Sequence, residues 1–207
     1  MNGNRFNELL AELVSLGHEM RGVECKPPGP RNDRLLQTKV IKAMLGMANR
    51  RDGGYIVIGI EDKGTSLVPV GLSLAHLTTW GKYDDLASTV AEYADPSISF
   101  ELESHDCDGK NYVLVTVKEF EDVPVICKKD YQPDLRKGGC YVRSRRKPET
   151  TELPTQEDMR DLLDLASEKR LRKFVAQAKS VGLGITASNQ VSDKDLFDRE
   201  LSDFYRG

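Results

Sequence analysis

The six-residue segment Tyr55–Ile60 constrains the fold most strongly, because every position in it is apolar or glycine. A turn at Asp52-Gly53-Gly54 precedes the segment and a turn at Lys63-Gly64 follows it, as is typical of a strand between two breaks. A strand with one face in water alternates polar and apolar residues, whereas an unbroken apolar run is typical of a strand buried on both faces. We therefore predict a central strand at Tyr55–Ile60.

Four helices are predicted around this strand. The segment Arg5–Leu16 carries leucines and a phenylalanine at three-to-four spacing, which indicates an amphipathic helix. A second helix is expected over Asp33–Asn49 and a third over Asp84–Tyr93. A long helix begins at the cap Thr155, with acidic residues in its first turn, and ends near Ser180.

Short apolar runs between these helices predict the remaining strands. They are Gly22–Lys26, Val68–Gly71, Ile98–Glu103, Tyr112–Val117, Val123–Cys127 and Cys140–Arg143. Several strands in a row between helices favour an α+β fold, with a mixed, mostly antiparallel sheet flanked by helices. We expect one domain over residues 1–181, including the long helix, and a polar tail over 182–207 with a short acidic helix at Ser192–Tyr205.

Composition excludes several classes of protein. The chain has 207 residues, 39% of them hydrophobic, and a net charge of −3, so it is not a uniformly basic nucleic-acid coat. No apolar run approaches the roughly 20 residues of a membrane span. The first residues lack a signal sequence, and the four cysteines contain no CxxC pair. We therefore expect a cytoplasmic protein with reduced thiols and no membrane partner.

Three carboxylates are candidates for a metal site. Glu24 and Lys26 lie two residues apart on a predicted strand and so share one face. If that strand lies beside Tyr55–Ile60, then Glu19, Glu24 and Asp62 converge. Clustered carboxylates repel one another and require a cation, and Mg²⁺ or Mn²⁺ prefers such oxygen ligands. A metal of this kind polarises a phosphate while a lysine stabilises the developing charge.

An alternative reading of the same residues needs no metal. A carboxylate and a lysine two positions apart on an edge strand often form a solvated ion pair that contributes little. Asp62, just before Lys63-Gly64, also fits a plain turn residue. Spacing alone does not decide between these readings.

A basic stretch near the end of the predicted sheet is a candidate phosphate-binding surface. Between Leu135 and Pro148 there is no acidic residue, and the basic ones are Arg136, Lys137, Arg143, Arg145, Arg146 and Lys147. Such a cluster suits a nucleic-acid backbone, and Arg50, Arg51 and Lys63 extend it toward the acids. The alternative is a solvated loop balanced by the neighbouring acids Glu149 and Glu152.

Several of these segments, taken in order, resemble the Schlafen/AlbA-type domain over roughly residues 5–165. They are Glu19-x-x-x-Val23-Glu24-Cys25-Lys26, the helix end Ala48-Asn49, the block Asp52-Gly53-Gly54-Tyr55-Ile56-Val57-Ile58-Gly59-Ile60-Glu61-Asp62-Lys63-Gly64, Val70-Gly71-Leu72 and the closing Tyr141-Val142-Arg143-Ser144. Two positions depart from the family pattern. Cys25 replaces a more usual aromatic residue, and Arg50-Arg51 follow Asn49 where a small hydroxyl residue is more common.

The resemblance implies nucleic-acid handling. Bacterial members are described as DNA-binding domains, and Schlafen relatives are metal-dependent endonucleases that cut tRNA and rRNA. Carried onto this chain, the catalytic carboxylates and metal ligands fall on Glu19, Glu24 and Asp62, and the catalytic lysine falls on Lys26. Binding-only members keep these acids too, so the residues permit catalysis without requiring it.

The resulting hypothesis is an Mg²⁺- or Mn²⁺-dependent endoribonuclease that acts on structured RNA such as tRNA, in a toxin or phage-defence role. The alternatives are a non-catalytic DNA- or RNA-binding regulatory module and a protein-interaction scaffold. Schlafen nuclease cores pair two related lobes, so a single lobe suggests a homodimer. A zinc site built from His105, Cys107, Cys127 and Cys140 is a further possibility, although separate buried thiols explain these cysteines more simply.

Overall fold

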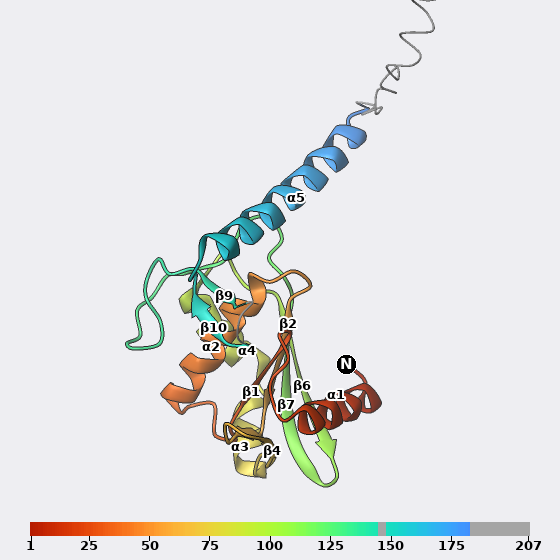
Figure 1. The fold of residues 1–207 in the computed structure, drawn as a ribbon, viewed down its shortest axis with the longest axis vertical. Helices are drawn as coiled ribbons and strands as arrows, with labels where there is room; N and C mark the ends of the chain where they lie inside the picture. Colours follow the sequence, from red (N-terminus) through yellow and green to blue (C-terminus); the bar gives the residue numbers. More distant parts are fainter. Residues whose placement is uncertain (145–147, 183–207) are drawn as a thin grey trace, which may run out of the picture. The chain divides into compact units, whose positions relative to one another are not determined.

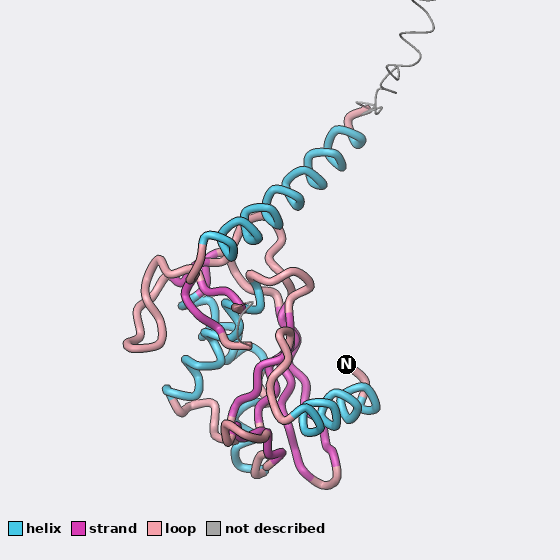
Figure 2. The backbone as a smooth tube through the Cα atoms, in the orientation of Figure 1, coloured by secondary structure: helices cyan, strands magenta, loops and turns pink. Residues whose placement is uncertain are grey.

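The structure is a computed structural model that describes residues 1–144 and 148–182. Its first compact unit is Met1–Ser167, and a second begins at Glu168. The predicted domain boundary at residue 182 stays a prediction, and the predicted helix Ser192–Tyr205 lies outside the described residues. In the described part of the chain, five helices and ten strands form an α+β fold (Figures 1 and 2), which confirms the predicted class.

The helices are α1 (Gly3–Leu16), α2 (Arg34–Ala48), α3 (Leu74–Trp80), α4 (Tyr83–Tyr93) and α5 (Gln156–Ser180). The strands are β1 (Val23–Lys26), β2 (Gly54–Ile58), β3 (Ile60–Asp62), β4 (Leu67–Pro69), β5 (Ala94–Asp95), β6 (Phe100–Cys107), β7 (Lys110–Val117), β8 (Ile126–Cys127), β9 (Tyr141–Arg143) and β10 (Thr150–Glu152).

A four-stranded sheet with the order β1-β2-β7-β6 forms the centre of the first unit. Strands β1 and β2 run parallel, with Glu24 opposite Ile56, and the other two pairings are antiparallel. The apolar segment therefore lies inside the sheet, as predicted. It is interrupted at Gly59, whose φ of 119° is readily adopted only by glycine. There the chain leaves the sheet, and β3 pairs with β4 in a separate hairpin.

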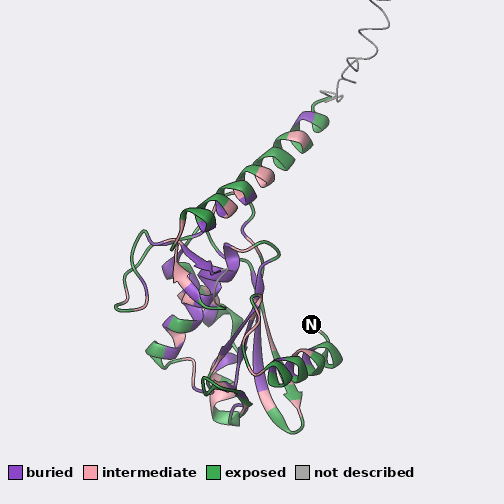
Figure 3. Cartoon of the chain, in the orientation of Figure 1, coloured by how far each residue is buried: buried purple, intermediate pink, exposed green. Residues whose placement is uncertain are grey.

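Helices cover both faces of this sheet (Figure 1). On one face, α1 packs Phe6 and Leu13 against Val57 of β2. On the other face, helix α2, with ten of its fifteen residues buried, packs against Ile56 and Ile58. Burial is concentrated in the central strands and α2, whereas α1 is exposed on its outer side (Figure 3). This two-sided cover explains why β2 carries no charged side chain.

Several elements differ from the sequence-based expectation. Helix α3, capped by Ser73, was not predicted, and it places Trp80 fully inside the core, where Nε1 donates to the Gly29 carbonyl at 2.9 Å. The predicted strand Val123–Cys127 is reduced to β8. Strand β10, which was also missed, pairs antiparallel with β9 and places Thr150 opposite Arg143. Within residues 1–144 and 148–182, no helix is long and apolar enough to cross a membrane.

Candidate functional site

Strand β1 directs its side chains alternately to the two faces of the sheet. Val23 and Cys25 join the core under α1, so Glu24 and Lys26 point to the α2 side. Glu24 is only 6% exposed, and its Oε1 accepts a hydrogen bond from Lys26 Nζ at 2.5 Å. The predicted same-face pair is therefore present, but it is buried rather than solvated.

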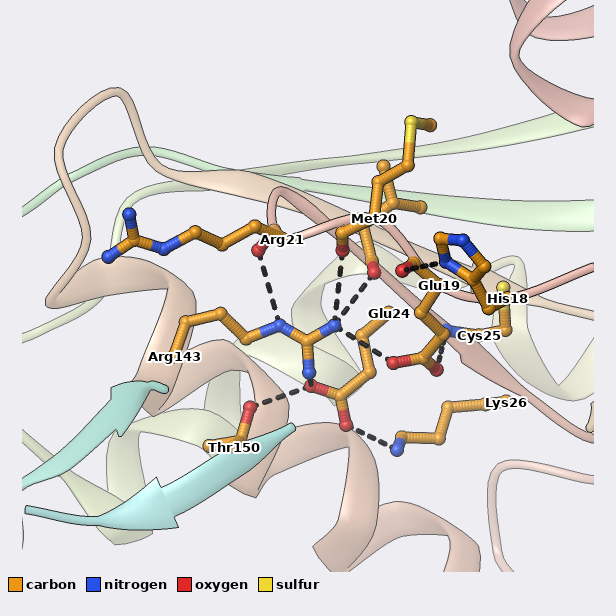
Figure 4. Close-up of polar contacts among 10 residues, drawn as sticks. His18, Glu19, Met20, Arg21, Glu24, Cys25, Lys26, Arg143 and Thr150 are labelled. Carbon is orange, nitrogen blue, oxygen red and sulfur yellow. Dashed lines mark hydrogen bonds and ion pairs between the residues drawn. The ribbon is translucent and has the colours of Figure 1, made fainter. Parts of the chain in front are cut away.

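Arg143, at the end of β9, connects this pair to Glu19. Its side chain has no exposed surface. Nη1 donates to Glu24 Oε2 and Nη2 donates to Glu19 Oε2, both at 2.9 Å (Figure 4). Two carboxylates are thus matched by two cations, Arg143 and Lys26, in what we call the acid–arginine cluster: Glu19, Glu24, Lys26, Arg143 and Thr150.

Thr150 completes the cluster from β10. Its Oγ1 donates to Glu24 Oε2 at 2.7 Å. The β9–β10 hairpin comes this close because α2 has a glycine at position 46, where a Cβ would lie 2.5 Å from Thr150 Cγ2. Asn49, just after α2, holds the same hairpin through a hydrogen bond from Nδ2 to the Tyr141 carbonyl at 2.9 Å.

The cluster also completes the edge of the sheet. Strand β1 is the edge strand of the order β1-β2-β7-β6, so one side of its backbone has no neighbouring strand. Glu19 Oε1 accepts from the Cys25 N–H at 2.7 Å, and Arg143 Nη2 donates to the Val23 carbonyl at 2.8 Å. These two side chains supply the acceptor and donor that a further strand would offer, which satisfies buried backbone groups.

Burial dominates the electrostatics of Glu19. Desolvation raises the pKa of Glu19 above its ordinary value of 4.5, although the hydrogen bonds from Arg143 and from the Cys25 backbone act in the opposite direction. Burial likewise raises the pKa of the Cys25 thiol to about 12. The raised pKa of Glu19 shows that removal from water outweighs the stabilisation that Arg143 and the Cys25 N–H give its charged form.

A cavity of about 570 Å³ lies beside the cluster and includes all four residues predicted to be catalytic. Glu19, Glu24, Lys26 and Asp62 line it, together with basic residues of α2, Lys39 and Lys42. Asp62 is exposed, and its Oδ1 accepts from the Gly64 N–H at 2.7 Å, which is the turn role of the alternative reading. The four residues therefore line one cavity, as expected if β1 lies beside β2.

The two glutamates do not fit a divalent metal in this arrangement. All four of their oxygens already accept hydrogen bonds, from Lys26, Arg143, Thr150 and the Cys25 backbone. Across the described ranges, no group of three or more His, Cys, Asp or Glu side chains is placed to hold a metal ion. A metal at Glu19 and Glu24 would have to displace bonded cations, so we derive no chemical step through one.

The four residues of the possible zinc site likewise form no metal-binding group within the described residues. Cys107, Cys127 and Cys140 are free thiols. His105 stacks on Phe6 of α1, with ring centroids 4.4 Å apart and an interplanar angle of 8°. Burial lowers the pKa of His105 below 6.5. The structure therefore gives His105 a packing role.

The predicted phosphate-binding residues have different surroundings. Arg145, Arg146 and Lys147 lie outside the described residues. Arg143 is buried against two carboxylates, so the prediction that it contacts phosphate does not agree with the structure.

Three other predicted basic residues are exposed. Arg136 pairs with Glu152, and Lys63 pairs with Glu61 at 2.8 Å. Lys137 is exposed on the same loop as Arg136. Phosphate binding by these residues stays a prediction.

Arg50 and Arg51 line a second cavity, of about 420 Å³, together with Arg21. Arg50 Nη1 donates to the carbonyls of Gly53 and Arg51 at 2.5 and 3.1 Å, which fixes its guanidinium. Burial, followed by repulsion from Arg21, lowers the pKa of Arg50.

Sequence reasoning missed Arg21, although it lies between Glu19 and Glu24 in a short segment whose other charged residues had been assigned a function.

Comparison with known proteins agrees with this architecture. A model of the family described as Schlafen, AlbA_2 matches residues 19–152, from the first glutamate of the cluster to the end of β10. The chain therefore belongs to the Schlafen AlbA_2 family, which indicates a nucleic-acid-related function. No curated protein matches the chain.

Solved structures similar to the chain include two bacterial proteins. One is the N-terminal domain of a putative ATP-dependent DNA helicase RecG-related protein from Nitrosomonas europaea, at 24% identity, TM-score 0.48 and coverage of 67% of this chain and 88% of that one. The other, from Corynebacterium diphtheriae, has 18% identity and TM-score 0.42, and the match covers 72% of this chain but 27% of that one.

Proposed function

We propose that this protein is a nucleic-acid-binding domain in which the acid–arginine cluster holds the binding surface in place rather than cutting the bound strand. The observation that carries this proposal is the engagement of all four carboxylate oxygens of Glu19 and Glu24 by donors of the chain itself. A cluster with matched charges has no unbalanced charge that requires a cation, and loss of either partner would leave the other buried and unpaired.

The charges around the cluster support binding. Lys26, Lys39 and Lys42 line the cavity beside it, together with the acids Asp62, Asp134 and Glu149. Basic side chains on the wall of a concave site attract the phosphate backbone by a salt-dependent interaction. Structured RNA such as tRNA is the first ligand to test, because the resemblance to Schlafen nucleases implies it, and duplex DNA is the second.

A binding assay tests the proposal directly. Fluorescence anisotropy with labelled tRNA and labelled duplex DNA is measured from about 50 to about 200 mM salt, where phosphate contacts weaken strongly. We expect Lys39→Ala with Lys42→Ala to reduce affinity, whereas Lys118→Ala with Lys129→Ala, which removes two exposed cations elsewhere, leaves it unchanged. Absence of salt-sensitive binding to either ligand contradicts the proposal and favours a protein-interaction scaffold.

A second candidate function is the metal-dependent endoribonuclease. It is favoured by one observation, that Glu19, Glu24, Lys26 and Asp62 line the same cavity. Labelled tRNA and DNA are incubated with Mn²⁺ or Mg²⁺ and the wild type or Asp62→Asn, because Asp62 is exposed and its replacement leaves the buried cluster intact. Cleavage that Asp62→Asn abolishes, with binding retained, would replace the first proposal with this one. Intact substrates in both samples support the binding domain.

A further inference from the structure

The second cavity is lined by residues of both charges. Arg21, Arg50 and Arg51 come from the segment before β1 and from the turn after α2, and Asp52 of that turn lies among them. The other acids come from the first turns of α5 and are Asp158, Asp161 and Asp164. Their spacing of three residues places them on one side of the helix. Because all of these residues belong to the first compact unit, the cavity is a property of a single folded body.

The three arginines are placed to hold an anion. The Arg50 guanidinium lies against Gly22, where a Cβ would make only ordinary van der Waals contact with three of its atoms, at 3.5 Å. The bonds from Arg50 to two carbonyls of its own turn hold it in one orientation. Burial and the nearby Arg21 lower the pKa of Arg50, whereas Asp52 acts in the opposite direction, so two guanidinium groups lie close together beside one acid. Crowded, oriented guanidinium groups favour planar or tetrahedral oxyanions.

We propose that Arg21, Arg50 and Arg51 form a seat for a backbone phosphodiester, and that the carboxylates of α5 compete with that phosphodiester for the same arginines. The inference rests on the proposed nucleic-acid binding and adds to it a location and an internal competitor. Carboxylates and phosphates present similar oxygen acceptors to guanidinium groups. The acidic side of α5 therefore weakens binding unless the nucleic acid displaces it or the acids are neutralised.

The seat adjoins the acid–arginine cluster. Arg143 lines both cavities, with its charge balanced by Glu19 and Glu24. Arg21, Arg50 and Arg51 line the second cavity without belonging to the cluster. Asp158 is buried, and its backbone N–H and Oδ2 are both bonded to the Thr155 hydroxyl, which leaves Asp161 and Asp164 as the acids to change.

Neutralising the competing acids tests the proposal. The variant Asp161→Asn with Asp164→Asn is compared with Glu101→Gln with Asp106→Asn, which removes two charges from exposed positions of β6 and so changes the net charge equally. In anisotropy titrations with labelled tRNA and duplex DNA, we expect the α5 variant to bind at least tenfold more tightly than the wild type and the β6 variant to bind less than threefold more tightly.

Removing the seat gives the complementary result. Arg21→Ala is expected to weaken binding tenfold or more in the wild-type background and to abolish the gain made by the α5 variant. If the α5 and β6 variants gain affinity equally, or if Arg21→Ala leaves the α5 gain intact, the seat is refuted although nucleic-acid binding stands. If no variant binds either ligand, the proposed function itself fails, so the two failures are distinguishable.

Discussion

Replacement of Arg143 tests whether the acid–arginine cluster is a structural device. In the wild type, Nη1 binds Glu24 while Nη2 binds Glu19 and the Val23 carbonyl. Lysine keeps the charge but offers one nitrogen, which cannot reach all of these acceptors together. We expect Arg143→Lys to lose one hydrogen bond to a charged group, which contributes about 1.5–3 kcal/mol, and one to a neutral carbonyl, which contributes about 1 kcal/mol. The substitution should therefore lower the free energy of unfolding by about 3 kcal/mol.

Arg143→Ala is expected to be more severe, because it leaves Glu19 and Glu24 buried without their shared partner. Breaking a buried ion pair in this way costs about 3–5 kcal/mol, within the 5–15 kcal/mol of a typical folded domain. Urea denaturation followed by circular dichroism measures both variants. The matched control is Arg136→Lys, which alters an arginine–glutamate pair that is exposed rather than buried. We expect no measurable change in its midpoint, since exposed pairs contribute little.

The pH dependence of Arg143→Ala has a defined sign. Burial already raises the pKa of Glu19, and loss of the arginine raises it further. A carboxyl whose pKa is raised by folding favours the folded state below its unfolded pKa, and this contribution is lost as the pH rises. The stability gap between wild type and Arg143→Ala should therefore narrow as the pH falls from about 7 to about 5. A gap of constant size, or Arg143→Lys as stable as the wild type, would refute the structural role.

Four further predictions follow from individual contacts. Asn49→Ala leaves the buried Val125 N–H and Tyr141 carbonyl without their partner and should lower the free energy of unfolding by about 2–4 kcal/mol in urea titrations. His105→Phe keeps the stack on Phe6 but cannot titrate. Folding lowers the pKa of His105, so below about pH 6.5 the unfolded chain takes up a proton there that the folded protein does not. Protonation of His105 should therefore lower the melting temperature of the wild type in acid, and this contribution should be absent from the variant. Iodoacetamide at about pH 8 should leave Cys25 unmodified in mass spectra of the folded protein, since its pKa is raised to about 12. The proposed homodimer predicts twice the monomer mass in light scattering, and Phe174→Glu should reduce that mass if the exposed apolar residues of α5 form the contact.

The sequence contained enough information to place the central strand and to bring the acids together. The apolar run Tyr55–Ile60 predicted a strand buried on both faces, and β2 is covered by α1 and α2. The expected neighbour of that strand is β1, in parallel register. The break at Gly59 was not predictable from hydrophobicity, because glycine does not interrupt an apolar run, although its backbone turns the chain out of the sheet.

The partner of the acids was not identified, although it was in the sequence. A cluster of carboxylates indicates a cation, but spacing does not say whether that cation is a metal or an arginine about 120 residues away. Arg143 follows Tyr141 and Val142 in a strand that is buried at every position. A charged residue within such a strand is itself a signal, because a buried arginine requires acceptors from elsewhere in the fold.

The structural role of the cluster determines which substitution can separate binding from catalysis. Replacing Glu19 or Glu24 unbalances a buried charge pair, and replacing Glu19 also removes the acceptor of the Cys25 N–H at the edge of β1. Any loss of cleavage or binding would therefore include a loss of folding. Arg143 lines both cavities, which extends the damage to the arginine seat. Asp62 lines the first cavity but lies outside the cluster, and its Oδ1 accepts from the Gly64 N–H in the turn between β3 and β4. It is therefore at Asp62, and not at the two glutamates, that an activity assay distinguishes a catalytic carboxylate from a structural one.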